Sequence, residues 1–373
     1  MQHSEPTLAA QEKLIALFDH IFEQSGMINI ITSPLSMYAC LAMVAEGSTG
    51  KTFKELADVF GYTTEAEIFD AGMLGAMHSL FDGGSKGVAL QMANMLFCSS
   101  SCPLKAAYAS AVVGRHRATA ENVDFGDSAT KRMINQRIEK STSGLIKDCV
   151  KKLDAKTVCV LVNTMYFKGV WKMQFNKKNT QPHNFQLADG KNIKVKFMNE
   201  KVKAALFTAS LVKYLALPYE GDKIKFVVEM PNNRKLTGID TGAVINIASE
   251  TSLINVRVSL PKFKIRFRVD LLPILQDLGV KGVLRGTCMK KITEKPVLIS
   301  QALHEAFIQV DEGGTEAAAA TVAVMGKGAC VPPSSFKAAS PFYFHIVDSS
   351  TSTILLTGAV QKPEFKQIVC RLC

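Results

Sequence analysis

Hydrophobic and polar positions along the chain repeat with two different periods, which predicts both helices and strands. Apolar residues recur at helical spacing in residues 8–22. A second apolar helix is predicted for residues 37–45, with its start at Ser33-Pro34 and its end at Gly47. Residues 75–81 also have a helical pattern, whereas residues 88–97, 302–310 and 342–347 have the pattern of strands. The chain is therefore predicted to combine helices with sheets.

The connection between the last two predicted strands is unusually long. About 30 residues separate Val310 from Phe342, whereas ordinary connections have roughly 4–6. The segment opens with Glu312-Gly-Gly-Thr-Glu-Ala-Ala-Ala-Ala320, and its glycines together with Pro332-Pro333 oppose one long helix. If it became a strand, one face would carry only small, uncharged side chains: Thr315, Ala317, Ala319, Thr321 and Ala323. Such a face could enter a packed core without overfilling it.

This segment resembles the hinge of the reactive-centre loop in the serpin family of serine protease inhibitors. Other motifs resemble signatures of the same family, in the family's order and over nearly the whole chain. They are Asn29-Ile-Ile-Thr-Ser33-Pro34-Leu-Ser36, Asn163-Thr-Met-Tyr-Phe-Lys-Gly-Val-Trp171, Leu217-Pro-Tyr-Glu-Gly221, Leu260-Pro-Lys262, and Ser352-Thr-Ile-Leu-Leu-Thr-Gly-Ala-Val360 followed by Pro363. One such motif is weak evidence, but the ordered set is specific.

The resemblance implies an α+β serpin fold. The expected architecture is a single large domain over residues 1–373, with three β-sheets, about nine surrounding helices and an exposed reactive-centre loop at about 312–340. The loop is offered to a serine protease as bait. After cleavage, while the protease is held as an acyl-enzyme, the hinge inserts into the central sheet and the protease is distorted. On this interpretation the protein is not an enzyme, has no catalytic residue, cofactor or metal, and acts as a monomer.

The resemblance also assigns roles to particular residues. The hinge comprises Glu312, Gly313, Gly314, Thr315, Glu316, Ala317, Ala318, Ala319 and Ala320. Ser33, Ser36, Asn163 and His304 match the family's shutter, a buried polar cluster beneath the sheet where strands separate to admit the loop. Trp171 matches the breach, where insertion begins. A buried polar cluster must keep its hydrogen bonds satisfied in both states, so substitutions there are expected to be poorly tolerated.

Several bonds in the loop are candidates for cleavage by the target protease. Counting sixteen positions beyond Glu312, as in most serpins, gives Gly328 before the scissile bond, and a loop one residue shorter gives Lys327. Lys327–Gly328 is favoured because it suits a trypsin-like protease. The alternatives are Gly328–Ala329 and Met325–Gly326, the latter suited to a chymotrypsin- or elastase-like protease. Cys330 lies nearby in the sequence and is expected to be an incidental exposed thiol, with an adduct or mixed disulfide as the alternative.

Two other functions remain open at this stage. A non-inhibitory serpin, acting as a carrier, chaperone or storage protein, would share the fold but would be expected to have a bulky or charged residue, or proline, in its hinge. This hinge has Thr315 and four alanines, which favours inhibition. Inhibition of a cysteine protease is the second alternative, although no aspartate near the candidate bonds suggests a caspase.

The formal net charge is +11, and the sharpest basic cluster is Lys262, Lys264, Arg266 and Arg268, which alternates with hydrophobic residues at strand period. The favoured interpretation is a half-buried strand with a solvated basic face. A polyanion site, for a glycosaminoglycan or a nucleic acid, is the alternative. No apolar run reaches the ~18 residues of a membrane span, and no membrane partner is expected.

The amino terminus lacks the pattern of a secretory signal, and nine cysteines are an odd number. These features favour a reducing, cytoplasmic setting or export without a visible signal. Cys40, Cys149 and Cys159 are expected to be buried free thiols, and Cys370 and Cys373 to be free thiols near the end of the chain.

Two motifs resemble catalytic signatures without their context. Gly50-Lys51-Thr52 ends like a phosphate-binding loop but follows a predicted helix and lacks the first glycine of the motif. Gly83-Gly-Ser85-Lys-Gly87 has the spacing of a nucleophile elbow but lies between a helix and a strand in the wrong order. Neither motif therefore indicates an enzyme.

Overall fold

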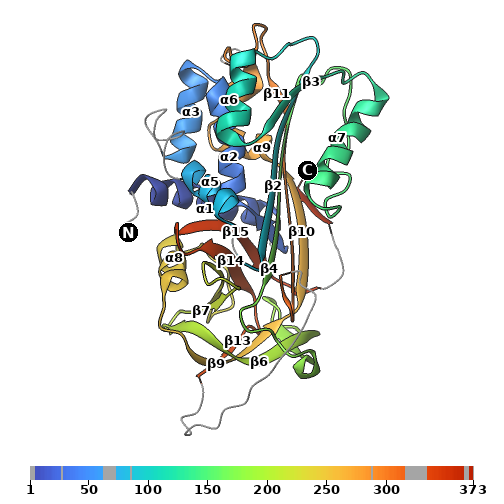
Figure 1. The fold of residues 1–373 in the computed structure, drawn as a ribbon. Helices are drawn as coiled ribbons and strands as arrows, with labels where there is room; N and C mark the ends of the chain where they lie inside the picture. Colours follow the sequence, from blue (N-terminus) through green and yellow to red (C-terminus); the bar gives the residue numbers. More distant parts are fainter. Residues whose placement is uncertain are drawn as a thin grey trace.

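The structure is a computed structural model that describes residues 5–26, 28–61, 73–84, 86–286, 289–315, 334–364 and 369–372. Two groups of strands dominate it (Figure 1). Nine α-helices lie in the described part of the chain, together with one short 3-10 helix, Lys177–Asn179. None of the described helices is long and apolar enough to cross a membrane.

The first group is a seven-stranded sheet, called here the hinge sheet. Its strands follow the order β16 (Val369–Leu372), β10 (Phe263–Asp270), β11 (Ile299–Asp311), β12 (Gly314–Thr315), β4 (Cys159–Val170), β2 (Val88–Ser99) and β3 (Thr119–Val123). Over most of their length β11 and β4 pair directly and in parallel, from Ile299 opposite Cys159 to Phe307 opposite Tyr166. The two-residue strand β12 lies between them at one end only.

The second group has nine strands and divides at the long strand β6 (Asn192–Thr208). One part contains β1 (Ile30–Thr32), β15 (Thr353–Val360), β14 (Phe342–Asp348), β8 (Ile224–Pro231) and β7 (Val212–Pro218), in that order. The other part, called here the outer sheet, contains β5 (Gln181–Gln186), β6, β9 (Ile254–Pro261) and β13 (Ser334–Lys337). The outer sheet forms the lower end of the molecule in Figure 1.

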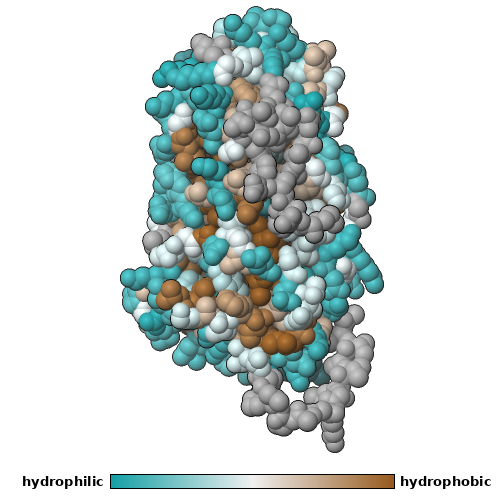
Figure 2. Space-filling view, turned by 90° about the vertical axis from the view of Figure 1, so that its left-hand side faces the viewer, coloured by the Kyte–Doolittle hydropathy of each residue, from teal (hydrophilic) through white to brown (hydrophobic). Residues whose placement is uncertain are grey.

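Helices cover both faces of the hinge sheet. Most lie to the left of it in Figure 1, and α7 (Ser128–Ser141) lies on the other side. The others are α1 (Glu5–Gln24), α2 (Pro34–Gly47), α3 (Gly50–Phe60), α5 (Met73–Gly83), α6 (Ala106–His116), α8 (Thr241–Ser249), α9 (Leu271–Asp277) and α10 (Gly282–Arg285). Figure 2 shows the side that bears α1, α3 and α8, where hydrophilic residues dominate the upper part and hydrophobic residues gather in the lower part.

Helix α2 shows how the sequence forms the centre of the fold. Pro34 occupies the first turn, where its missing N–H costs nothing, and the Ser33 hydroxyl accepts a hydrogen bond from the Ser36 N–H at 3.0 Å. The helix is hydrophobic all round, and all its residues except Glu46 are buried. It is therefore a core helix held between the sheets and the other helices.

The sequence-based element predictions are confirmed at each of these positions. Residues 8–22 lie in α1, 37–45 in α2, 75–81 in α5, 88–97 in β2, 302–310 in β11 and 342–347 in β14. Both ends of the loop predicted at 312–340 are strands in the structure, because Gly314–Thr315 and Ser334–Lys337 pair in sheets.

The prediction of a free thiol at Cys159 is wrong. Cys159 forms a disulfide with Cys98, and the Cα atoms are 4.3 Å apart. The two residues lie directly opposite each other in the antiparallel pair β2–β4. Sequence patterns do not fix the register between strands 61 positions apart, so this pairing could not be anticipated. Cys40 and Cys149 are buried and free, as predicted.

Candidate functional site

The predicted hinge begins inside the hinge sheet. Thr315 pairs with Val310 of β11 and with Gly169 of β4, and both pairings are antiparallel. Gly314 pairs in the same way with Asp311 and Val170. All four residues from Glu312 to Thr315 are buried, although the sequence implied an exposed loop here. The start of the predicted hinge is thus a short strand of this sheet.

Gly314 is required by this close approach. Its backbone has φ = +148°, a conformation that side chains with a Cβ rarely adopt, and a Cβ would lie 2.0 Å from the Gly169 carbonyl oxygen. Any other residue would have to push β4 and the hinge apart. The glycine therefore permits β12 to enter the sheet at this point.

The side chain of Thr315 is held in a pocket of aromatic residues. Its hydroxyl lies 2.5 Å from the Tyr219 hydroxyl. Both side chains are fully buried, and burial raises the pKa of Tyr219, so its hydroxyl stays protonated. The Tyr219 ring stacks on the Trp171 ring with centroids 4.6 Å apart. A small polar side chain at position 315 therefore fits this pocket, and a charged one does not.

Trp171 fastens the entry of the hinge at the predicted breach. Its indole N–H donates to the Asp311 carbonyl oxygen at 2.9 Å, and its backbone N–H donates to the Gly313 carbonyl oxygen at 3.1 Å. Phe175 adds a third bond, from its backbone N–H to the Glu312 carbonyl oxygen at 2.9 Å. These three hydrogen bonds therefore hold the turn from β11 into β12 in place.

Glu312 forms the charged anchor of the hinge. Its carboxylate accepts hydrogen bonds from the Lys262 ammonium and from the Thr180 hydroxyl, each at 2.7 Å. Only 4% of Glu312 is exposed. Burial alone would raise the pKa of Glu312, but the two hydrogen bonds and the positive charge of Lys262 outweigh it and lower the pKa. The ion pair is therefore formed at neutral pH.

The four predicted shutter residues form one buried network. The Asn163 amide nitrogen donates to the Ser36 carbonyl oxygen at 2.9 Å and to the Ser36 hydroxyl at 2.5 Å. The Asn163 amide oxygen lies 2.5 Å from Nδ1 of His304, and Nε2 of His304 accepts from the Ser33 N–H at 3.2 Å. Asn163 lies on β4 and His304 on β11, the two strands between which β12 begins.

Asn94, which was not among the predicted site residues, completes this network. Its amide oxygen accepts a hydrogen bond from Asn163, directly across the β2–β4 register. Asn94 is 3% exposed and lies in the mainly apolar run of β2. A polar amide within such a run is the only signal that could have indicated it. Tyr219 was likewise named only as part of a motif.

His304 is neutral within this network. Burial lowers its pKa to about 3, and its Nε2 must be unprotonated to accept the bond from Ser33. Because the unfolded chain takes up this proton near pH 6.5, the contribution of His304 to stability is complete above that pH. It decreases as the pH falls from about 6.5 toward 3.

We therefore expect the ring signals of His304 to show no titration between pH 8 and pH 5. Nuclear magnetic resonance of protein with ¹³C-labelled histidine would measure this, with a His304→Gln variant to assign the signal. A titration midpoint near the ordinary value of about 6.5 would contradict the buried, neutral assignment.

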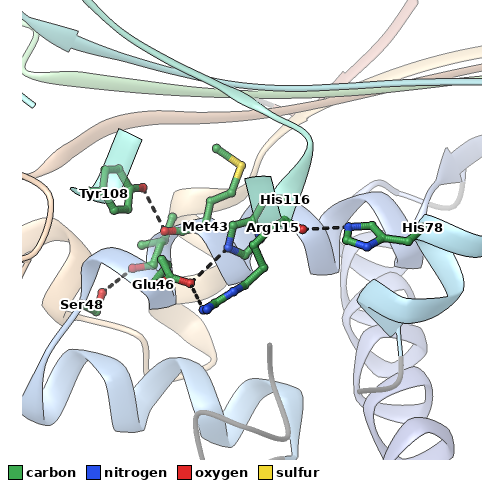
Figure 3. A network of polar contacts seen from close by, with 8 residues as sticks. Met43, Glu46, Ser48, His78, Tyr108, Arg115 and His116 are labelled. Atoms are coloured by element: carbon green, nitrogen blue, oxygen red, sulfur yellow. Dashed lines mark hydrogen bonds and ion pairs between the residues drawn. The ribbon is translucent and has the colours of Figure 1, made fainter. Parts of the chain in front are cut away.

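A second polar network ties α2 to α6 and α5 (Figure 3). The Glu46 carboxylate accepts from Arg115 at 2.7 Å and lies 3.5 Å from Nε2 of His116. The His78 ring nitrogen lies 2.9 Å from the Arg115 carbonyl oxygen. Burial would raise the pKa of Glu46, but the His116 and Arg115 contacts outweigh it and lower the pKa. This network holds together helices beside the hinge sheet, and the contacts given above link its members to one another and not to the described hinge residues.

The basic strand does not have the solvated face that the sequence suggested. Arg266 is 9% exposed and donates to the buried carboxylate of Glu305. Arg268 donates to the Cys149 carbonyl oxygen at 2.6 Å. The Lys264 ammonium lies 5.2 Å from the centroid of the Phe307 ring, and Lys262 binds the hinge. All four cations therefore have contacts within the protein, and a polyanion site at this strand remains an untested prediction.

The remaining predicted site residues lie outside the described residues. These are the rest of the hinge, namely Glu316, Ala317, Ala318, Ala319 and Ala320, and the candidate cleavage residues Met325, Lys327, Gly328 and Ala329. Among the residues that the structure does describe, no group of three or more His, Cys, Asp or Glu side chains could hold a metal ion.

Comparison with known proteins identifies the architecture. The family model for Serpin (serine protease inhibitor) matches residues 10–363. The chain belongs to the serpin family. Among curated relatives, a serine proteinase inhibitor of Cavia porcellus is 34% identical over 357 residues, which cover 92% of this chain and 86% of that protein.

Solved serpin structures share the fold. Serpin-12 of Manduca sexta superimposes with a TM-score of 0.85 at 22% identity, covering 96% of this chain and 99% of that one. Native protease nexin-1, solved with heparin, has a TM-score of 0.82 at 26% identity with the same coverage. The predicted α+β serpin fold is confirmed, and membership of this family supports a function of the protease-inhibitor type.

Proposed function

We propose that this serpin inhibits a trypsin-like serine protease by inserting its cleaved reactive-centre loop, at about residues 312–340, into the hinge sheet. The observation that carries the proposal is strand β12. Gly314 and Thr315 already pair with both β11 and β4, in the antiparallel direction that a continuing inserted strand would follow. Glu312 is anchored at the start of this strand and does not have to move.

Insertion requires β11 and β4 to separate beyond β12. Their parallel ladder from Ile299 to Phe307 would be exchanged for two antiparallel ladders, one on each side of the new strand. The net gain is about one ladder of hydrogen bonds, on the order of ten at roughly 0.5–1.5 kcal/mol each. Burial of the small-residue face of the hinge adds to it. The uncleaved protein is then held in its state by kinetics.

The proposed shutter and breach would control this separation. The bond between Asn163 and His304 crosses from β4 to β11 and has to be replaced when a strand comes between them. Ser36, Ser33 and Asn94 provide other partners for the freed groups. Trp171 fixes the start of the hinge through its bonds to Asp311 and Gly313. The arrangement supports a sheet that opens from the breach toward the shutter.

For the reactive bond we propose Lys327–Gly328. A trypsin-like protease cleaves after a basic residue, and Lys327 is the only lysine between Thr315 and Ser334. Lys327→Ala should therefore reduce the rate of trypsin inhibition by at least about 100-fold, because the charged contact in the protease pocket is lost. A factor of 100 in rate corresponds to about 3 kcal/mol of activation free energy.

The time course of residual trypsin activity measures this rate, and Lys54→Ala is the matched control because it removes an exposed lysine on α3, outside the loop. Undiminished inhibition by Lys327→Ala would move the reactive bond to Gly328–Ala329 or Met325–Gly326. Cleavage of the wild-type protein without any covalent complex would instead favour a non-inhibitory serpin or an inhibitor of cysteine proteases.

A further inference from the structure

The outer sheet bears a concave basic surface, called here the basic groove. It has a volume of about 600 Å³ and is lined by the side chains of β5, β6, β9 and β13. Its charged and polar lining includes Lys201, Arg257, Lys337, His183, Asn199 and Ser259. Its lining contains no shutter or breach residue and none of the described hinge residues, Glu312 to Thr315.

The register of the strands brings the cations together. Lys201 of β6 lies directly opposite Arg257 of β9, and Arg257 lies opposite Ser335 of β13. Lys337 follows two residues after Ser335 and so points to the same face of β13. Like charges directly opposite each other destabilise a sheet. The Lys201–Arg257 pair is therefore unfavourable unless an anion lies against it.

No such anion comes from the described part of the chain. Neither Lys201, Arg257 nor Lys337 forms an ion pair with any described residue, and all three are exposed. The one carboxylate in the lining, Glu200, accepts bonds from the backbone N–H groups of Asn176 and Lys201. The groove therefore presents three cations to solvent, and its single carboxylate, Glu200, is already hydrogen-bonded to backbone N–H groups.

The floor of the groove is rigid. The Phe197 ring is fully buried, the Lys337 ammonium lies 5.7 Å from its centroid, and the His183 ring meets its edge with centroids 5.8 Å apart. The Ser259 hydroxyl donates to the Asn199 amide oxygen at 2.7 Å, which links β9 to β6. A ligand would thus meet a Lys337 ammonium that is already positioned.

The groove lies where a protease on the loop must lie, if the proposed function is correct. Strand β13 begins at Ser334, six residues after Gly328 in the sequence. Six residues reach at most about 20 Å, which is less than the width of a protease domain. A protease bound at Lys327–Gly328 would therefore extend over the outer sheet.

We propose that the basic groove docks an acidic surface segment of the target protease before the loop is cleaved. Three cations within one concavity match two or three carboxylates, whereas a long polyanion requires an extended row of charges. Such complementarity accelerates encounter and contributes to the choice of partner. This inference rests on the proposed function and adds to it a recognition surface outside the loop.

The test compares two variants of equal charge change. Lys201→Glu/Arg257→Glu/Lys337→Glu reverses the groove, and Lys13→Glu/Lys51→Glu/Lys54→Glu reverses three exposed lysines on α1 and α3, away from the outer sheet (Figure 1). The association rate with the protease that gives a covalent complex is measured at 0.05 and 0.5 M salt, together with the stoichiometry of inhibition.

We expect the groove variant to associate at least about tenfold more slowly at low salt, with a smaller difference at high salt, where charges are screened beyond a few ångströms. Its stoichiometry of inhibition should be unchanged, because insertion does not involve the groove. Equal rates for the groove variant and the wild type, or equal slowing in both variants, would overturn the proposal.

A second measurement separates this inference from the proposed function. Fluorescence anisotropy gives the affinity of a labelled ten-residue glutamate peptide and of a heparin octasaccharide for each protein. Peptide binding that is lost only in the groove variant supports the groove, even if no protease is inhibited. Binding of heparin alone, dependent on the groove, would overturn docking of a protease segment.

Discussion

Thr315→Arg should convert the inhibitor into a substrate. The protease would still cleave the loop, but insertion would require the arginine to occupy the fully buried pocket beside Tyr219, where no described acidic side chain is hydrogen-bonded to the Thr315 hydroxyl. Burial of an unpaired charge costs several kcal/mol. Since about 1.4 kcal/mol changes a partition tenfold, the number of inhibitor molecules consumed per protease should rise at least about tenfold.

The measurement is the stoichiometry of inhibition, read beside the fraction of cleaved and complexed protein on denaturing gels. Thr315→Ser is the matched control, because it keeps a small hydroxyl that can reach Tyr219 and should inhibit like the wild type. If Thr315→Arg formed covalent complex as efficiently as Thr315→Ser, insertion of the hinge would not be the inhibitory step.

Glu312→Lys should release the hinge and destabilise the native protein. The substitution removes the bonds to Lys262 and Thr180 and places two ammonium groups where an ion pair was. Breaking a buried pair by changing one partner typically costs about 3–5 kcal/mol. We expect the thermal unfolding temperature, at a fixed scan rate, to fall by several degrees.

The reciprocal variant Lys262→Glu/Glu312→Lys provides the control, because it restores opposite charges at the same two positions. It should recover a substantial part of the lost stability, which a double-mutant cycle would express as a coupling energy. A single Glu312→Lys variant that unfolds at the wild-type temperature would show that this ion pair does not hold the hinge.

Local patterns predicted the fold well because they record which face of an element is buried. The helix α2 was predicted from its apolar residues and from Ser33 and Pro34 at its start. The strand β11 was predicted from its alternating pattern. The family motifs then gave the order of the elements. These signals are contained within short stretches of sequence, so they can be interpreted without knowledge of the register between strands.

The details of the site depend on contacts between distant parts of the chain. The depth at which β12 enters the sheet depends on the Thr315–Tyr219 bond and on the absence of a side chain at Gly169. The disulfide of Cys98 with Cys159 and the contact of Asn94 with Asn163 both follow from the β2–β4 register. None of these contacts has a signature in either partner alone.

The same reason explains why the basic strand was misjudged and the basic groove was missed. The pattern of β10 showed cations every second residue, but not that Glu305 on the next strand would neutralise Arg266. The groove gathers Lys201, Arg257 and Lys337 from three strands that are far apart in the sequence. A cluster of charges that forms only through strand pairing cannot be identified from the sequence of any one strand.

Incubation of the wild-type protein with trypsin, chymotrypsin and elastase in separate reactions tests the central claim most directly. Denaturing gels and the mass of the released carboxy-terminal peptide are the two readouts. Insertion-based inhibition predicts a covalent complex with trypsin that survives denaturation, and a released peptide that begins at Gly328. Complete cleavage by all three proteases with no covalent complex would contradict it.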